Sequence, residues 1–225
     1  MRRMYPLLSA AFLALILAGC SVNTNNGGVT VSDIQNVEPP TASPAESPKD
    51  TQPSEPSPDQ HDSLVDIGQE VVELLRERDL KSLAQWIDPE LGLRFSPYSY
   101  INKDSDLIFK PEELPAFKDT TQLMWGSFDG SGDPIKLTFR DYYDKFVYNR
   151  DFADAPNVSA NKILGLGNAE YNGTEVYPNS SYVEFHFPGT DKKYEGMDWQ
   201  SLVLVFVPHG DDWKLVAVVH GQWTI

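Results

Sequence analysis

The first candidates for chemistry in this sequence lie in the stretch SYVEFHF, residues 181–187. Polar and apolar residues alternate strictly there, so a β-strand would place Tyr182, Glu184 and His186 on one face and the apolar residues on the other. A carboxylate on the same face as a histidine could orient the imidazole as a general base. The row could instead be a solvated outer face that carries cross-strand polar pairs, and we favour this second interpretation.

His220 is a further candidate, close to the C-terminus in the strand-like run WKLVAVVHGQWTI. Its imidazole could be a hydrogen-bonded, half-buried group, or it could enter a pocket and move a proton. With Glu184 and His186, His220 completes the set of catalytic candidates. Strict alternation would place His220 on one strand face with Lys214, Val216, Val218, Gln222 and Thr224.

Arg94, in the stretch GLRFSPYSYI, is a candidate for ligand binding. Its guanidinium could hold the carboxylate of a ligand, or it could pair with an acidic residue of the chain such as Asp129, which we favour. Trp125 could offer an aromatic surface to a ligand, although tryptophans are more often part of a core or its rim. Together with Tyr182 and His220, Arg94 and Trp125 are the predicted ligand-binding residues.

The segment DGSGDP, residues 129–134, places oxygen-bearing side chains at alternate positions, as a calcium loop does. An EF-hand loop also needs Gly at its sixth position and Glu at its twelfth, where this chain has Pro134 and Arg140. We therefore interpret the segment as turn chemistry and predict no metal site. The P-loop, GxSxG, HExxH and GxGxxG motifs are absent from the sequence, and we predict no cofactor.

Cys20 is the only cysteine of the chain, which excludes an intrachain disulfide. It follows the basic residues Arg2 and Arg3 and an apolar run at 7–17, which is too short to span a bilayer. The tetrapeptide LAGC that ends at Cys20 resembles the lipobox of bacterial lipoproteins. The resemblance implies a signal peptide over residues 1–19, a diacylglycerol on the Cys20 sulfur, and anchoring at the extracytoplasmic face of the cell membrane. The alternative is an ordinary secretory signal with a bystander cysteine.

Residues 20–62 are rich in Pro, Ser and Glu and have no aromatic residue. Such a composition cannot bury enough apolar surface to offset its ordering entropy, so we expect a disordered tether. The formal net charge of -15 argues against nucleic acid as a partner and against electrostatic attraction to anionic lipid headgroups. The acyl chains on Cys20 would therefore hold the protein to the membrane alone.

Residues 63–225 have the length of a single globular domain. Apolar residues at 64, 67, 71, 74 and 75 predict one face of a first helix, and Asp79 predicts the N-cap of a second helix over 80–87. Aromatic residues at helical spacing follow the cap candidate Thr138. Strands are predicted over 91–95, 121–128, 163–171, 181–187, 201–207 and 213–223, with a hairpin turn at 208–212 and the strand before it central in the sheet.

This order of elements predicts an α+β fold. The stretches RDLKSLAQWIDPELGLRF and WKLVAVVHGQWTI resemble the opening and closing segments of the nuclear-transport-factor-2-like (cystatin-like cone) superfamily. The resemblance implies N-terminal helices packed on a strongly curved antiparallel sheet, often with a pocket. We therefore expect a lipid-anchored module of the bacterial cell envelope that binds a small ligand or an envelope protein. The alternative is a small-molecule enzyme with an acid/base pocket.

Overall fold

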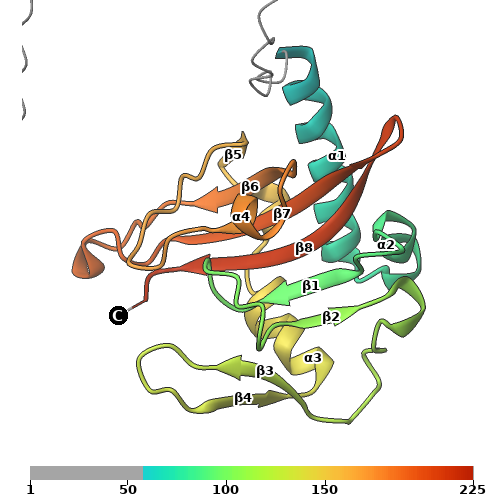
Figure 1. The fold of residues 1–225 in the computed structure, drawn as a ribbon. Helices are drawn as coiled ribbons and strands as arrows, with labels where there is room; N and C mark the ends of the chain where they lie inside the picture. Colours follow the sequence, from blue (N-terminus) through green and yellow to red (C-terminus); the bar gives the residue numbers. More distant parts are fainter. Residues whose placement is uncertain (1–57, 225) are drawn as a thin grey trace, which may run out of the picture. The chain divides into compact units, whose positions relative to one another are not determined.

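A computed structural model describes residues 58–224 (Figure 1). The predicted signal peptide, Cys20 and the predicted tether up to residue 57 lie outside the described residues. Within residues 58–224, no helix is both long enough and apolar enough to cross a membrane.

The chain enters the described part with two helices, α1 (Pro58–Glu77) and α2 (Leu80–Trp86). α1 begins before the predicted domain start at residue 63, and its apolar face includes the buried side chains of Leu64 and Val71, as the spacing predicts. Asp79 is the N-cap of α2, because its carboxylate accepts a hydrogen bond from the Ser82 backbone N–H at 3.0 Å. The two helical predictions near the N-terminus are therefore confirmed.

The main sheet has six strands in the order β2-β1-β8-β7-β6-β5. Only the contact between β1 and β8 is parallel, and all other neighbours are antiparallel. This arrangement confirms an α+β fold with a mostly antiparallel sheet. The sheet is twisted but not strongly curled (Figure 1), so the predicted strong curvature is wrong. The strands are β1 (Leu93–Ser96), β2 (Leu107–Phe109), β5 (Asn157–Ala160), β6 (Ser181–Phe187), β7 (Gln200–His209) and β8 (Asp212–Gln222).

Smaller elements complete the fold. A separate hairpin is formed by β3 (Leu123–Ser127) and β4 (Pro134–Leu137). The helical elements after η1 (Pro111–Glu113) are α3 (Phe139–Tyr142), the π-helical turn η2 (Tyr143–Val147), η3 (Phe152–Asp154), α4 (Gly173–Val176) and η4 (Lys192–Tyr194).

The main core lies between the sheet and the helical elements α1, α3 and η2. Thr138 caps α3 as predicted, and the aromatic side chains that follow it at helical spacing are all buried. Trp125 stacks on Tyr142 with ring centroids 3.8 Å apart, and Phe95 meets both Tyr142 and Phe139 edge-on. Aromatic packing of this kind adds to the free energy gained from burial alone.

The predicted hairpin of β7 and β8 is confirmed, and β7 is central, with both of its faces covered. Val205 pairs with Ala217, whereas the next residue, Phe206, pairs with Leu215. Val216 is therefore the extra residue of a β-bulge, and the alternation of side chains reverses there. The predicted single-face row of β8 is wrong for this reason.

The outer face of the sheet carries a second, smaller apolar cluster that includes Val203, Val219 and Tyr177. The segment 161–170 contacts this face. From residue 163 onwards it falls within the strand predicted over 163–171. It is irregular instead, because the carboxylate of Glu184 accepts hydrogen bonds from the backbone N–H groups of Leu164 and Gly165. The strand next to β6 is formed by residues 157–160, which the sequence pattern did not predict.

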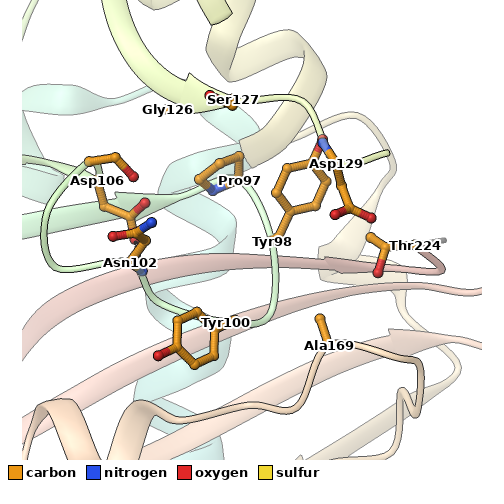
Figure 2. Close-up of a pocket in the computed structure, with 11 residues that line it drawn as sticks. Pro97, Tyr98, Tyr100, Asn102, Asp106, Gly126, Ser127, Asp129, Ala169 and Thr224 are labelled. Carbon is orange, nitrogen blue, oxygen red and sulfur yellow. Dashed lines mark hydrogen bonds between the residues drawn. The ribbon is translucent and has the colours of Figure 1, made fainter. Parts of the chain in front are cut away.

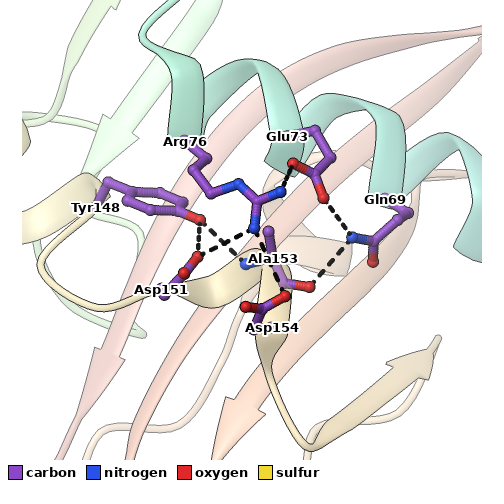
Figure 3. A network of polar contacts seen from close by, with 7 residues as sticks. All are labelled: Gln69, Glu73, Arg76, Tyr148, Asp151, Ala153 and Asp154. Atoms are coloured by element: carbon purple, nitrogen blue, oxygen red, sulfur yellow. Dashed lines mark hydrogen bonds and ion pairs between the residues drawn. The ribbon is translucent and has the colours of Figure 1, made fainter.

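A polar network fastens α1 to the segment before β5 (Figure 3). The Arg76 guanidinium pairs with Glu73 of its own helix and lies 3.7 Å from Asp151 and 3.5 Å from Asp154. The Gln69 side chain donates to the Ala153 carbonyl at 3.2 Å. The charged groups are between about one third and three quarters exposed, so the ion pairs orient the segment more than they stabilise the fold.

Candidate functional site

A cleft of about 320 Å³ opens where β1 and β8 end. Because these two strands are parallel, their carboxyl ends lie at the same edge of the sheet. The segments that leave them meet the end of β3 and the irregular segment before α4 there (Figure 2). We call this cleft the strand-end pocket. Its lining residues are Pro97, Tyr98, Tyr100, Asn102, Ser105, Asp106, Gly126, Ser127, Asp129, Ala169 and Thr224.

Asp106 is the most enclosed charged group of the pocket, with 8 % of its surface exposed. Its Oδ2 accepts hydrogen bonds from the Ser96 hydroxyl and from the Asn102 backbone N–H, the latter at 2.9 Å. No donor among the described residues reaches Oδ1, and this oxygen is not sealed from the cleft. One oxygen therefore holds the carboxylate in place, and the other is free to contact a ligand.

Burial raises the pKa of Asp106 to about 6, against the opposing effects of its hydrogen bonds to Ser96 and Asn102 and of the Arg94 charge. A desolvated carboxyl group resists ionisation because the charged form loses its hydration. A strongly perturbed acid within a cleft is a recognised mark of functional sites. The pocket thus holds a carboxyl group that changes charge close to neutral pH.

The wall around Asp106 is preorganised by the chain itself. The Asn102 carbonyl accepts from the Asp106 backbone N–H at 2.9 Å, which closes the turn. Asn172, which precedes α4 as its N-cap residue, fixes the same segment, since its side-chain amide exchanges two hydrogen bonds with the backbone of Ile101, at 2.8 Å and 3.1 Å. Tyr98 is held by its hydroxyl, which accepts from the Asp129 backbone N–H at 3.0 Å.

Gly126 forms part of the opposite wall, at a bulge between Met124 and Ser127 in β3. Its φ of +103° is a conformation that side-chain-bearing residues rarely adopt. A Cβ at this position would lie 3.4 Å from the Ser105 hydroxyl, which is an ordinary contact distance. It is therefore the backbone conformation of the bulge that calls for glycine at this position.

Arg94 was predicted to bind a carboxylate, with Asp129 as its favoured partner. The side chain is 7 % exposed, and no ion pair joins it to Asp129 among the described residues. Its Nε donates to the Tyr177 hydroxyl at 3.0 Å, while one terminal nitrogen has no partner within the described part of the chain. Arg94 does not line the pocket, but its charge acts to lower the pKa of Asp106.

Trp125 and Tyr182, the other aromatic candidates, lie outside the strand-end pocket. Trp125 is fully buried in the core, where its Nε1 donates to the Leu137 carbonyl at 3.0 Å. Tyr182 is half-buried and packs against Tyr171, with ring centroids 4.8 Å apart.

Glu184 and His186 do share one face of β6, with Glu184 Oε1 3.8 Å from His186 Nδ1. His186 Nδ1 lies 2.8 Å from the Ser201 hydroxyl, and burial lowers its pKa. Both side chains are buried on the outer face of the sheet, rather than solvated. The structure thus brings the pair together without placing it in the strand-end pocket.

His220 faces the main core instead of a pocket. It is 0 % exposed, packs edge-on against Phe146, and its Nε2 lies 3.2 Å from the Gln222 side-chain oxygen. Its Nδ1 has no partner within residues 58–224. Burial lowers the pKa of His220 to about 4, so the imidazole is neutral at physiological pH.

The pocket residues Tyr98, Tyr100, Asn102 and Asp106 were not predicted as a site. A signal was nevertheless present, because the strand of Arg94 ends in SPYSYINKDSD, where two tyrosines and several polar side chains follow a proline. Residues after a strand end commonly build sites on loops held by a rigid scaffold. In the part of the chain that the structure describes, no group of three His, Cys, Asp or Glu side chains could hold a metal ion.

Comparisons of this chain with protein-family models, with curated proteins and with solved structures found no match.

Proposed function

We propose that this chain is a lipid-anchored binding module of the bacterial cell envelope, and that the strand-end pocket holds a small polar ligand. The LAGC stretch ending at Cys20 supports the anchor, and the Pro-, Ser- and Glu-rich segment supports a tether of roughly 35 Å. The observation that carries the binding role is Asp106, which is nearly enclosed in a preorganised cleft and keeps one oxygen free.

The dimensions and chemistry of the pocket support this proposal. A volume of about 320 Å³ lies at the lower end of the range for small-molecule sites, so the ligand is of monosaccharide size or smaller. The rings of Tyr98 and Tyr100 offer apolar faces, while Asp106, Asp129 and Thr224 offer oxygen atoms. Such a mixture serves ligands that have both carbon surface and polar groups.

Thermal unfolding of the full-length protein with a panel of small sugars, amines and organic acids tests the proposal. A compound that binds only the folded state at a hundredfold excess over its Kd raises Tm by roughly 5–10 °C. We expect this rise to disappear in Asp106→Asn. We expect it to persist in Asp104→Asn, which removes an exposed carboxylate outside the pocket two residues away.

Asp106→Asn should remain folded at neutral pH, because it removes a carboxylate whose ionisation burial opposes. A panel that gives no Tm rise, or a rise unaffected by Asp106→Asn, would contradict the binding role of the pocket.

The second candidate function is an enzyme that uses Asp106 as an acid or base. It is favoured by the free Oδ1 and by the pKa of Asp106, about 6, which suits proton transfer near neutral pH. The catalytic candidates Glu184, His186 and His220 do not line this pocket. Incubation of any bound compound with the protein, followed by NMR, separates the two functions, since an enzyme would convert the compound.

We also propose a distant relationship with the nuclear-transport-factor-2-like superfamily. Two helices that lead into β1, and a closing strand that lies beside β1, support it. An experimental structure whose topology differs from that superfamily would overturn the relationship and leave the pocket unaffected.

A further inference from the structure

We infer that the strand-end pocket selects a small organic ammonium ion, and that Asp106 is the anion that recognises it. This inference rests on the proposed binding function and names the class of the ligand. It depends on the charges of the pocket, on two free oxygen atoms and on the aromatic rings between them.

The charged side chains that line the pocket are all carboxylates. Asp106 and Asp129 are the two acids, and no Lys, Arg or His is among the lining residues. The charge of Arg94 balances part of the charge of Asp106, but no carboxylate of the described residues pairs with Arg94 within 4 Å. Two negative charges and one positive charge give the site a net charge of about -1. An anionic ligand would be repelled.

Two acceptor atoms in the pocket are unsatisfied. Asp106 Oδ1 receives no hydrogen bond from the described residues. Thr224 is 8 % exposed and lines the pocket, and its hydroxyl likewise has no partner within residues 58–224, although its carbonyl accepts from Asn168. Neither oxygen is among the sealed polar atoms of the described residues, so both are open to the cleft and available to a ligand that donates hydrogen bonds. A protonated amine has three donors and no acceptor.

The tyrosine rings favour a cationic ligand over a neutral ligand that donates hydrogen bonds. Figure 2 shows Asp106 and Asn102 at one end of the labelled residues and Asp129 and Thr224 at the other, with Tyr98 between them. The hydroxyl of Tyr98 is already engaged by the Asp129 backbone, which fixes the ring beside the cleft. A cation near the face of a tyrosine gains a favourable interaction that a neutral hydroxyl does not.

The net charge of the whole chain also favours a cationic ligand. A formal charge of -15 raises the local concentration of cations around the protein and lowers that of anions. A weakly bound ammonium ligand would thus reach the pocket at a higher rate than a neutral analogue of equal size.

Paired ligands that differ in one group test the inference on the full-length protein. Calorimetric titration compares glucosamine with glucose, and putrescine with 1,4-butanediol. We expect each amine to bind at least tenfold more tightly than its alcohol partner, because a hydrogen bond to a buried charge contributes about that factor or more. Asp106→Asn should bring each pair close to equal affinity, and Asp104→Asn should keep the preference.

Putrescine also provides a pH readout, because it remains a dication across the range used. The ionisable groups around Asp106 are Arg94 and the phenols of Tyr98, Tyr142 and Tyr177. Burial raises the pKa of all three phenols, so the tyrosines stay uncharged between about pH 5 and pH 7. With a pKa of about 6, the ionised fraction of Asp106 falls roughly tenfold from pH 7 to pH 5. We expect the affinity for putrescine to fall by a similar factor, and to change little in Asp106→Asn.

Equal affinity for glucose and glucosamine would overturn the ammonium inference and leave the binding function standing. The same holds if a neutral or anionic compound of the wider panel binds in an Asp106-dependent way and neither amine does. Failure of every compound in the panel to bind would contradict the proposed function itself, and the inference with it.

Discussion

His220 is a buried titratable residue whose environment makes the stability of the fold depend on pH. Its imidazole is fully buried beside Phe146, and burial lowers its pKa to about 4. An unfolded histidine has a pKa near 6.5, so between about pH 4 and pH 6.5 the unfolded chain binds one more proton at this residue than the folded chain does. This difference destabilises the fold as the pH falls.

Replacing His220 with Leu should remove the part of the stability loss at low pH that is due to this imidazole. The wild-type free energy of unfolding should fall by about 3 kcal/mol more than that of His220→Leu between pH 7 and pH 4. Asp106 acts in the opposite direction, because its raised pKa gives the folded state the additional proton over part of this range. It does so in both proteins, so the difference between them isolates His220. Urea titrations at several pH values measure it.

His209→Gln serves as the control for this experiment, since His209 is the last residue of β7 and its side chain is 52 % exposed. If His220→Leu and the wild type lose stability in parallel on acidification, the imidazole is not held neutral by burial.

The sequence predicted the composition of the strand faces better than the position of the site. Glu184 and His186 were correctly placed on one face, because alternation in a strand depends only on neighbouring residues. Their burial depends on the segment 161–170, and the pocket around Asp106 depends on two strands, paired between residues 123 positions apart, that end at the same edge. A contact of this range leaves no periodic signal in the sequence.

At the scale of elements, Glu184 joins a strand to an irregular segment. Its two carboxylate oxygens accept from the backbone N–H groups of Leu164 and Gly165, the latter at 3.0 Å. Gly165 lies so close to Trp199 that a Cβ would come within 2.5 Å of the indole. Both contacts hold the segment against the outer face of the sheet, and Ala169 at its end lines the pocket.

Glu184→Gln should release this segment. A glutamine has one acceptor oxygen, and its NH₂ group would face a backbone N–H. We expect a loss of about 1.5–3 kcal/mol in the free energy of unfolding, together with faster hydrogen exchange at Leu164 and Gly165. Hydrogen exchange followed by mass spectrometry measures the local effect. Glu170→Gln, at an exposed position of the same segment, should behave as the wild type.

Unchanged exchange in the Glu184→Gln protein would mean that apolar packing against Trp199 holds the segment without the carboxylate.

Helices were predicted more reliably than strands, for a physical reason. The capped helices at Asp79 and Thr138 are encoded by residues within one turn of each other. The strand predicted over 163–171 failed because a distant carboxylate takes its backbone donors, and the row on β8 failed at the bulge of Val216. Both outcomes are decided by tertiary partners, which override local pattern.

At the scale of the whole molecule, the attachment to a membrane that we propose depends on Cys20, which lies outside the described part. Within residues 58–224, no helix can cross a membrane, and the negative charge of the chain does not favour anionic lipid surfaces. The attachment that we propose is through acyl chains on Cys20. One acyl chain gives only marginal binding, whereas the two chains of a diacylglycerol give a stable anchor.

Replacing Cys20 with Ser distinguishes a lipoprotein signal from an ordinary secretory one. A serine hydroxyl does not replace the thiolate in the acyl transfer, and in lipoproteins cleavage follows acylation of the cysteine. Mass spectrometry of the native protein should find an N-terminus at Cys20 with a diacylglycerol thioether. Cys20→Ser should accumulate as an unprocessed precursor that incorporates no labelled lipid, while Ser21→Ala should be acylated and cleaved as the wild type is. A secretory signal would be removed whether or not Cys20 is present, so a cleaved and unlipidated Cys20→Ser protein would remove the membrane anchor from the proposed function.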